Sequence, residues 1–299
     1  MPSIDFQTLC GTGVVKGVTD QYADGKMAGV YKDFIGDTNI RTENYKKFLL
    51  DMLKKKGCRR ILDVACGTGI DSVMLLEEGF DVVSTDGSDK MLKYALETRW
   101  NRRKEPAFDN WIIREANWLN VYETVKDLVG DGFDAVICFG SSFAHLVDSY
   151  GDQREHKEAI KNFEKCLKVG GLLLVDHRNY DQLLNGTQPK QCVYYDASSI
   201  TNITTSVLSV MGKPTLVIRD YIVESKQNEK NKGVGTKSNS KTELRLMFYP
   251  HMMEDFRNIL KEIFGKNSSC ITLGDFKELN EIKNPIFYIH IVEKPKKML

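Results

Sequence analysis

Two short segments carry residues whose types and spacing suit the binding of a nucleotide-like ligand. One apolar run stops at Ala65-Cys66-Gly67-Thr68-Gly69, and the next apolar run stops at Asp86. A glycine turn between a strand and a helix lets a ligand approach the backbone and the amino end of the helix. An acid at the end of the following strand can accept hydrogen bonds from both hydroxyls of a ribose. The two segments therefore predict a site for a ligand that contains a ribose.

The glycine turn does not match the motifs that bind phosphate. A dinucleotide site needs G-x-G-x-x-G, but Ser72 stands at the position of the third glycine. The phosphate-loop pattern G-x-x-x-x-G-K-[ST] is absent from the sequence. Asp63 precedes the turn, and an acid there suits a ligand that is cationic at that point, such as one with an amino group and a sulfonium.

A purely structural interpretation of the same residues is the alternative. Asp63 would then bond the amides of the turn, and Asp86 would cap the next helix. Gly67 and Gly69 would serve only packing. We favour the ligand, because one cause then explains all of these residues at these spacings.

These residues need a sheet that brings the ends of several strands together. Strands are expected at residues 59–66, 81–86, 111–116, 133–140 and 172–177. Helices are expected around residues 41–57 and at 71–78, 88–102 and 153–169, with Ser88 as an N-cap. Near-continuous apolar strands that alternate with helices are typical of a parallel sheet covered on both faces.

The pattern changes after the fifth predicted strand. Four β-like runs follow without an intervening helix: CVYYDAS, ITTSVLSVM, PTLVIRDYIVES and ELRLMFYP. They predict an inserted antiparallel subdomain, with residues 226–241 as a mobile hairpin loop. A helix at 251–264, a strand at 270–276 and the strand IFYIHIVEK then resume the α/β pattern. We therefore expect an N-terminal arm with helices (1–58), a cofactor-binding core (59–179), the inserted β subdomain (180–250) and the C-terminal part of the core sheet (251–299).

Composition and charge narrow the class of protein. The 299 residues include 42 Lys and Arg against 41 Asp and Glu, so the formal charge is +1. This balance gives no bias toward nucleic acid or an anionic membrane. The seven cysteines are scattered without a C-x-x-C pair, which favours reduced thiols over disulfides or a metal site. No apolar run is long enough to span a membrane, and the first residues lack the features of a signal peptide. We expect a cytoplasmic protein with no metal and no nucleic acid partner.

The segments LDVACGTG and STDGSDKML together resemble the S-adenosylmethionine-dependent methyltransferases. From residue 20 to the last strand, the chain also resembles the glycine N-methyltransferase family in the order and spacing of FIGDT, SDKMLKYAL, RWNRR, EPAFD, EANW, SFAHL and DHRNYD. The resemblance implies an α/β fold with a seven-stranded Rossmann-like methyltransferase sheet and an inserted antiparallel β subdomain. It further implies a cytosolic homotetramer that converts glycine to sarcosine and S-adenosylmethionine to S-adenosylhomocysteine.

The resemblance assigns a set of residues to the cofactor. They are Tyr22, Tyr31, Arg41, Asp63, Ala65, Gly67, Gly69, Asp86, Asn117, Trp118, Phe139 and His145. Arg41 is expected to pair with the methionine carboxylate, and Asn117 and Trp118 to lie near the adenine. The simpler interpretations are core packing for Trp118 and a hydrogen-bonded loop position for His145.

A second set falls on the amino acid acceptor. It comprises Phe34, Gly140, Ser141, Arg178, Tyr195 and Tyr221. Arg178 is expected to bind the acceptor's carboxylate in a bidentate arrangement, the alternative being a structural ion pair with a nearby acid. The inserted β subdomain, which carries both tyrosines, would then be the lid over the site. No residue is expected to act as a general base, because the methyl donor is already activated and the amine can lose its proton to solvent.

Four positions depart from the family pattern. Tyr31 stands where the family has a tryptophan, Phe34 replaces a tyrosine, and Ser141 replaces an asparagine. Lys16 stands where the N-terminal arm carries a glutamate, which bears on the folate that family members bind as a regulator at subunit interfaces. A pocket that loses a hydroxyl and an amide discriminates less between small amines. The acceptor is therefore glycine, or alternatively sarcosine or another small amino acid.

Two further functional classes are alternatives. One is a protein that binds the cofactor with little turnover. The other is a methyltransferase of macromolecules, which the sequence disfavours because the fourth strand ends in ICFGSSFAHL instead of [DN]-P-P-[YF].

Overall fold

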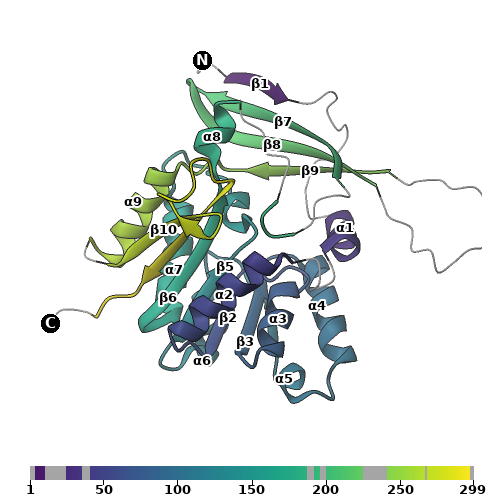
Figure 1. The fold of residues 1–299 in the computed structure, drawn as a ribbon, viewed down its shortest axis with the longest axis vertical. Coiled ribbons are helices and arrows are strands. Elements are labelled where there is room, and N and C mark those ends of the chain that lie inside the picture. The colour runs from purple at the N-terminus through teal and green to yellow at the C-terminus, as the bar shows by residue number, and fades with distance from the viewer. Residues whose placement is uncertain are drawn as a thin grey trace, which may run out of the picture.

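The fold contains two β-sheets, a large one flanked by helices and a smaller antiparallel one beside it (Figure 1). The computed structural model describes residues 4–10, 25–35, 41–186, 192–195, 200–224, 241–266 and 268–296. Within these residues, no helix is both long and apolar enough to cross a membrane.

The large sheet has the strand order β11-β10-β12-β6-β5-β2-β3-β4. Its strands are β2 (Arg60–Asp63), β3 (Asp81–Asp86), β4 (Ile112–Glu115), β5 (Phe133–Cys138), β6 (Leu167–Arg178), β10 (Cys270–Gly274), β11 (Lys277–Glu278) and β12 (Phe287–Glu293). The five strands from β6 to β4 run parallel, whereas β12 is antiparallel to both of its neighbours. The predicted methyltransferase sheet is confirmed, with the two-residue β11 added at one edge.

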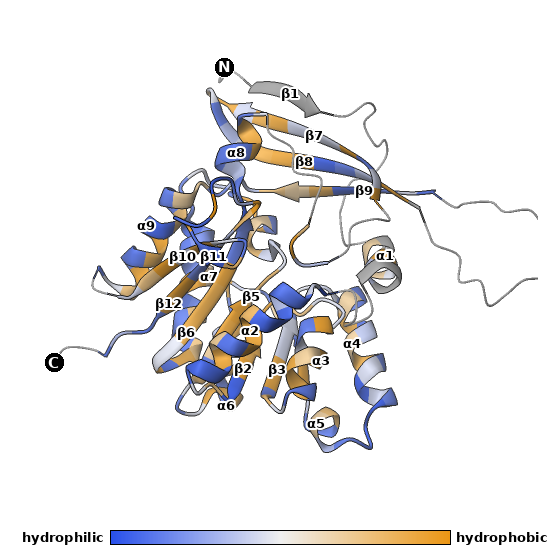
Figure 2. Cartoon of the chain, in the orientation of Figure 1, coloured by the Kyte–Doolittle hydropathy of each residue, from blue (hydrophilic) through white to orange (hydrophobic). Residues whose placement is uncertain are grey.

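The central strands of this sheet are largely hydrophobic (Figure 2). Successive residues along a strand point to opposite faces, and each face packs against its own layer of helices. Ile61 of β2 packs with α2 (Glu43–Lys55), α3 (Ile70–Glu77), α4 (Asp89–Asn101) and α5 (Pro106–Asp109). The next residue, Leu62, packs with α6 (Val121–Val129), α7 (Arg154–Cys166) and α9 (Met253–Phe264). The Ser88 hydroxyl accepts a hydrogen bond from the Met91 amide, so it caps α4 as expected.

The smaller sheet has the order β1-β7-β8-β9 and is antiparallel throughout. Its strands are β1 (Ile4–Cys10), β7 (Ile200–Val210), β8 (Lys213–Glu224) and β9 (Lys241–Phe248). Met211 and Gly212 both have positive φ, as the two-residue turn between β7 and β8 requires. The predicted inserted sheet is confirmed, and most of the predicted loop at 226–241 lies outside the described residues.

Several predicted elements differ from the structure in kind or in length. Residues Cys192–Tyr195 of the run CVYYDAS form no strand, and Tyr195 makes a single β-bridge to Arg41 instead. The N-terminal arm, for which no strand was predicted, contains strand β1 paired to β7. Helix α7 ends at Cys166 and not at residue 169, because Leu167 is buried and already pairs with Phe133 of β5.

Short helices complete the surroundings of the smaller sheet. They are α1 (Lys26–Ile35), the 3₁₀ helix η2 (Ser142–His145) and α8 (Tyr180–Leu184). Buried residues of these helices, among them Met27, Ala144 and Tyr180, pack against Val217 and Val223 of β8. The smaller sheet is therefore held above the carboxyl ends of the parallel strands (Figure 1).

Candidate active site

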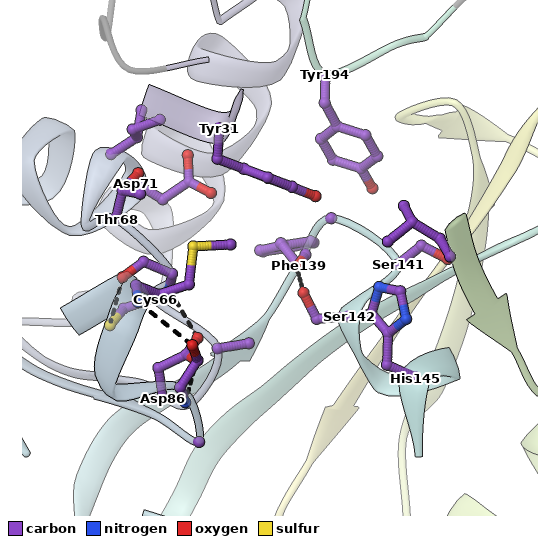
Figure 3. Close-up of a pocket in the computed structure, with 18 of the residues that line it drawn as sticks. Tyr31, Cys66, Thr68, Asp71, Asp86, Phe139, Ser141, Ser142, His145 and Tyr194 are labelled. Atoms are coloured by element: carbon purple, nitrogen blue, oxygen red, sulfur yellow. Dashed lines mark hydrogen bonds between the residues drawn. The ribbon is translucent and has the colours of Figure 1, made fainter. Parts of the chain in front are cut away.

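A cavity of about 530 Å³ lies between the carboxyl ends of the parallel strands and the smaller sheet. Most of the residues predicted for the cofactor line it: Tyr31, Arg41, Ala65, Gly67, Asp86, Asn117, Trp118, Phe139 and His145. So do the predicted acceptor residues Gly140, Ser141, Arg178, Tyr195 and Tyr221. Figure 3 shows the glycine turn with Asp86 on one side of the cavity and Ser141 with His145 on the other. The two sets of residues thus share one cavity.

The cofactor half of the cavity is built around Asp86 at the end of β3. One carboxylate oxygen accepts a hydrogen bond from the Gly67 amide at 2.8 Å, and the other accepts one from the Ser88 amide at 2.9 Å. Burial raises the pKa of Asp86, and the bonds from the Ser88 and Gly67 amides oppose that shift. Gly67 has φ +54° with open space where a Cβ would stand. Asp86 therefore both faces the cavity and holds the turn in place.

Asp63 and Gly69 were predicted to contact the cofactor but do not line the cavity. Asp63 accepts hydrogen bonds from the Ala65 amide at 3.2 Å and the Ser72 hydroxyl at 2.7 Å. A Cβ on Gly69 would lie 2.7 Å from the Trp111 ring. Burial and the neighbouring Asp71 raise the pKa of Asp63 to about 7. These two residues support the turn from beneath, as the structural alternative proposed.

Ser72 is the first residue of a buried hydrogen-bond chain. Its hydroxyl donates to Asp63 and accepts from Ser84 at 2.8 Å, and Ser84 accepts from the Trp111 indole at 2.7 Å. A glycine at position 72, as in the dinucleotide motif, would leave the Ser84 hydroxyl and Asp63 without this link. The serine that argued against a dinucleotide site is thus part of the turn's support.

Arg41 lines the cavity near the glycine turn and is paired with Asp71, an acid that the sequence analysis did not single out. Its Nε and one terminal nitrogen donate to the two carboxylate oxygens of Asp71, each at 2.9 Å. The other terminal nitrogen makes no hydrogen bond within the described residues, so it remains a donor for a ligand carboxylate. Asp71 follows the glycine turn directly in GTGID, and this position could have identified it as a residue of the site.

Trp118 and Asn117 follow β4 at the far end of the cofactor half. The Trp118 indole donates to the Val64 carbonyl at 2.6 Å, and its ring stacks on Phe143 with 5.6 Å between centroids. The Asn117 side chain accepts from the Leu119 amide at 2.9 Å. Trp118 is therefore anchored by packing and also presents a surface to the cavity.

His145 joins the large sheet's loops to the smaller sheet. Its Nδ1 lies 2.9 Å from the Met247 carbonyl, so this nitrogen carries the proton, and its ring lies 4.5 Å from that of Phe248. Burial lowers the pKa of His145 to about 4. The side chain is therefore neutral near pH 7.

The acceptor half is centred on Ser141, Asp176 and Arg178. The Ser141 amide donates to the Asp176 carboxylate at 2.8 Å, and the Ser141 hydroxyl accepts from the Arg178 amide at 3.3 Å. Burial raises the pKa of Asp176 to about 7. The Arg178 guanidinium lies over the Phe287 ring, 4.6 Å from its centroid, and forms no ion pair with any described residue. This arrangement leaves its charge available to an anionic ligand.

Tyrosines supply much of the remaining wall. Tyr31 of α1 reaches into the cavity, as Figure 3 shows, and burial raises its pKa to about 12. Tyr194 also lines the cavity and packs edge-on against Tyr45 and Phe287. Sequence reasoning missed Tyr194, although its place beside Tyr195 in CVYYDAS was a signal.

Three residues of the sequence analysis cannot be placed in this cavity. Tyr22 and Lys16 lie outside the described residues, as does the side chain of Phe34, whose backbone belongs to α1. Within the described residues, no group of three or more His, Cys, Asp or Glu is arranged to hold a metal ion.

Comparison with known proteins supports one family. A family model described as "Methyltransferase domain" matches residues 54–262. The chain is 50% identical to the glycine N-methyltransferase of Rattus norvegicus, over 93% of this chain and 94% of that protein. It is 34% identical to a glycine/sarcosine N-methyltransferase of Parasynechococcus marenigrum, over 88% of this chain and 81% of that protein. A solved S-adenosylmethionine-dependent methyltransferase from Clostridium acetobutylicum shares the fold, with a TM-score of 0.63 at 16% identity over 91% of this chain and 99% of that one.

Proposed function

Since this chain belongs to the glycine N-methyltransferase family of S-adenosylmethionine-dependent enzymes, we propose that it methylates the amino group of glycine and forms sarcosine. The observation that carries the choice of acceptor is the 50% identity over nearly the whole of a glycine N-methyltransferase. Arg178 lines the cavity and has no ion pair among the described residues, which supports this choice because glycine offers one carboxylate to one guanidinium.

The cofactor half has the groups that S-adenosylmethionine would need. Asp86 presents a carboxylate for the ribose, and Gly67 leaves open space for a close approach to the backbone. Arg41 keeps one terminal nitrogen for the methionine carboxylate, and Trp118 and Asn117 border the space for the adenine. When bound, S-adenosylmethionine supplies a methyl group on a sulfonium, which an amine can accept without further activation.

The acceptor half would orient glycine. Arg178 would hold the carboxylate, while Tyr195, Tyr221 and the Gly140 backbone would direct the nitrogen toward the cofactor half. The smaller sheet, within residues 180–250, would serve as the lid that excludes water. The amine must be neutral to react, and we propose that it loses its proton to solvent, since no side chain of the described cavity is assigned as a general base.

The altered pocket gives the alternative acceptor. Ser141 lines the cavity with a short side chain, so a larger amine such as sarcosine has more room there than beside an asparagine. Relatives at lower identity carry the name glycine/sarcosine N-methyltransferase. We place glycine first because the relatives named for glycine alone reach the higher identity.

The resemblance to the family also suggests how the protein assembles and where in the cell it is located. We propose a homotetramer in the cytosol, with the N-terminal arm reaching a neighbouring subunit and folate as a regulator at the interface. The described cysteines form no disulfide, which fits a reducing compartment. Light scattering with and without a folate would test both the assembly and the regulator.

Release of S-adenosylhomocysteine by the purified protein tests the proposed function. Glycine, sarcosine, dimethylglycine and several unrelated amines are supplied separately at equal concentrations. The fastest turnover is expected with glycine. Turnover with sarcosine but not glycine would establish the alternative acceptor. Cofactor binding by calorimetry with no turnover on any amine would instead establish a binding protein.

A further inference from the structure

A second arginine, Arg219, lies buried behind the acceptor half of the cavity and pairs with no opposite charge among the described residues. Arg219 of β8 is 3% exposed, and its Nε makes no hydrogen bond. No ion pair of Arg219 occurs within the described part of the chain. Burying a charge without a partner is costly, so buried arginines are normally paired. The lack of a partner for Arg219 therefore calls for a reason.

The opposite face of the same strand shows how this sheet treats an ordinary arginine. Arg245 of β9 donates two hydrogen bonds to Asp220, at 2.7 and 3.0 Å, across the β8–β9 pair. Arg219 stands one residue before Asp220 and points to the other face, between Val217 and Val223. The sheet thus pairs Arg245, which faces away from the cavity, whereas Arg219 on the inward face has no ion pair with a described residue.

The groups around Arg219 add no negative charge near pH 7. Its guanidinium lies over the Tyr221 ring, 5.2 Å from the centroid, and Tyr221 lines the cavity. Burial lowers the pKa of Arg219, and the nearby charge of Arg178 lowers it further. The titratable groups that face it come from β8, β6, α8 and the segment before β7: Tyr221, Arg178, Tyr180 and Tyr195. Two guanidiniums and three phenols therefore surround this end of the acceptor half.

We propose that Arg219 supplies a positive charge that keeps the acceptor's amino group neutral. The inference rests on the proposed function, in which the acceptor's carboxylate pairs with Arg178. That pairing neutralises one of the two guanidinium charges and leaves the charge of Arg219. A nearby positive charge disfavours the ammonium form, which releases its proton to water and keeps the lone pair on nitrogen. Arg219 does not line the cavity, so it acts through space from behind Tyr221.

The pH dependence of methyl transfer tests this role. Single-turnover rates are measured from pH 6 to 10 with saturating glycine and S-adenosylmethionine, in the full-length protein and in Arg219→Met. A unit charge at about 10 Å with an effective dielectric constant of about 20 shifts a pKa by about one unit. The apparent pKa of the bound amine is therefore expected to rise by about one unit in the variant, with a rate near pH 7 that falls about 10-fold.

A charge-conserving variant separates this effect from packing. Arg219→Lys is expected to keep an apparent pKa within a few tenths of a unit of the original. An unshifted pH profile in Arg219→Met, or an equal shift in both variants, would overturn the proposal. The proposal would also be overturned if Arg219→Met raised the glycine KM as much as Arg178→Met does, with no shift of the pH profile. Arg219 would then bind the carboxylate of glycine.

Two further measurements keep the outcome decisive. Arg219→Gln offers a polar neutral side chain if the methionine variant does not fold, and the same pH shift is expected. Without ligands, loss of an unpaired buried charge is expected to raise or preserve Tm, whereas a structural ion pair would lower it. Failure of the original protein to methylate any amine would refute the proposed function itself, whereas turnover without the pH shift would refute only the role of Arg219.

Discussion

The two halves of the cavity differ in how their charged groups are satisfied before any ligand binds. In the cofactor half, Asp86 accepts two backbone amides and Arg41 is paired with Asp71. In the acceptor half, Arg178 has no ion pair among the described residues. The charged groups of the cofactor half are thus satisfied by the protein itself, whereas Arg178 in the acceptor half would be neutralised only by a ligand's anionic group. Substitutions in the first should cost stability, and those in the second should cost activity.

The largest expected effect is on activity at Arg178. Arg178→Met should lower kcat/KM for glycine by about 10³-fold, because the acceptor carboxylate loses its partner. The free energy of unfolding should change by less than about 1 kcal/mol, since no protein carboxylate is left unpaired. Steady-state kinetics and urea denaturation measure the two quantities. A stability loss of several kcal/mol would show that Arg178 has a structural partner and would remove the contrast.

The opposite balance is expected at Asp86. Asp86→Ala leaves the Gly67 and Ser88 amides without their acceptor, which should cost about 2–4 kcal/mol of stability. Affinity for S-adenosylhomocysteine, measured by calorimetry, should fall by at least about 10-fold, because the turn and the ribose lose the same carboxylate. Asp109→Ala is a matched control, since that carboxylate is exposed and remote from the cavity. Unchanged stability in Asp86→Ala would refute the structural role of this carboxylate.

Two glycines of the same turn refine the description of the cofactor half. Gly69→Ala should cost about 3 kcal/mol, since its Cβ would lie 2.7 Å from Trp111 at φ +90°. Gly67→Ala should cost about 1 kcal/mol, since its space is open and only φ +54° is unfavourable. Thermal denaturation of the two variants measures the difference. Equal losses would mean that Trp111 moves aside.

The pH dependence of stability tests whether each half is built on a buried carboxyl group with a raised pKa. Asp63 and Asp176, one beneath each half, both have a folded pKa of about 7, raised chiefly by burial. Their contribution to stability is fully present below pH 4 and is lost as the pH rises through 7. Asp63→Asn and Asp176→Asn should each gain relative to the original protein by about 1.4 kcal/mol per pH unit between pH 4 and 7.

Denaturant titrations at several pH values measure these differences. The buried histidines act in the opposite direction, because burial lowers the pKa of His145 and His177 to about 4. They withdraw stability as the pH falls from about 6.5 toward 4, so only the comparison of each variant with the original isolates the carboxyl. A flat difference would mean that the carboxyl is ionised in the fold.

A smaller effect than at Arg178 is expected on the choice between acceptor amines. Ser141→Asn restores an amide to the acceptor half and should shift the ratio of glycine to sarcosine turnover toward glycine by about 10-fold. Competition between the two amines in one assay measures the ratio directly. An unchanged ratio would show that position 141 does not set the choice of acceptor. The role of the Ser141 hydroxyl would then be to accept the hydrogen bond from the Arg178 amide.

Strong local patterns predicted most of the large sheet. Runs such as Phe133–Cys138 are mostly apolar, bounded by turn residues and too short for a helix, so their assignment as strands was clear. The run CVYYDAS was predicted as a strand because its residues favour β structure, but Cys192–Tyr195 instead pack against α2 and β12. Helix α6 was not predicted, although its buried Val121, Val125 and Val129 follow helical spacing. In CVYYDAS, tertiary packing therefore overrode the local preference for β structure.

The site was predictable where a residue's role depends on its place after a strand. Asp86 and Arg178 each follow or end a core strand, so the sheet carries them to the same edge. Asp63 was misplaced because an acid before a glycine turn has the same sequence signature whether it faces a ligand or a buried serine. Arg219 was not singled out, since its missing partner is a property of the folded neighbourhood and not of the sequence.

The pairing of β1 with β7 also bears on how the chain is made. Ile4 pairs with Val210, so β1 meets its partner only after about 200 further residues have been synthesised. At a synthesis rate of about 5–20 residues per second, that wait is on the order of 10–40 s. The glycine turn and the parallel strands β2 to β6 are synthesised before Val210. During translation the parallel strands around the glycine turn can therefore assemble before the smaller sheet, in which β1 must wait for β7.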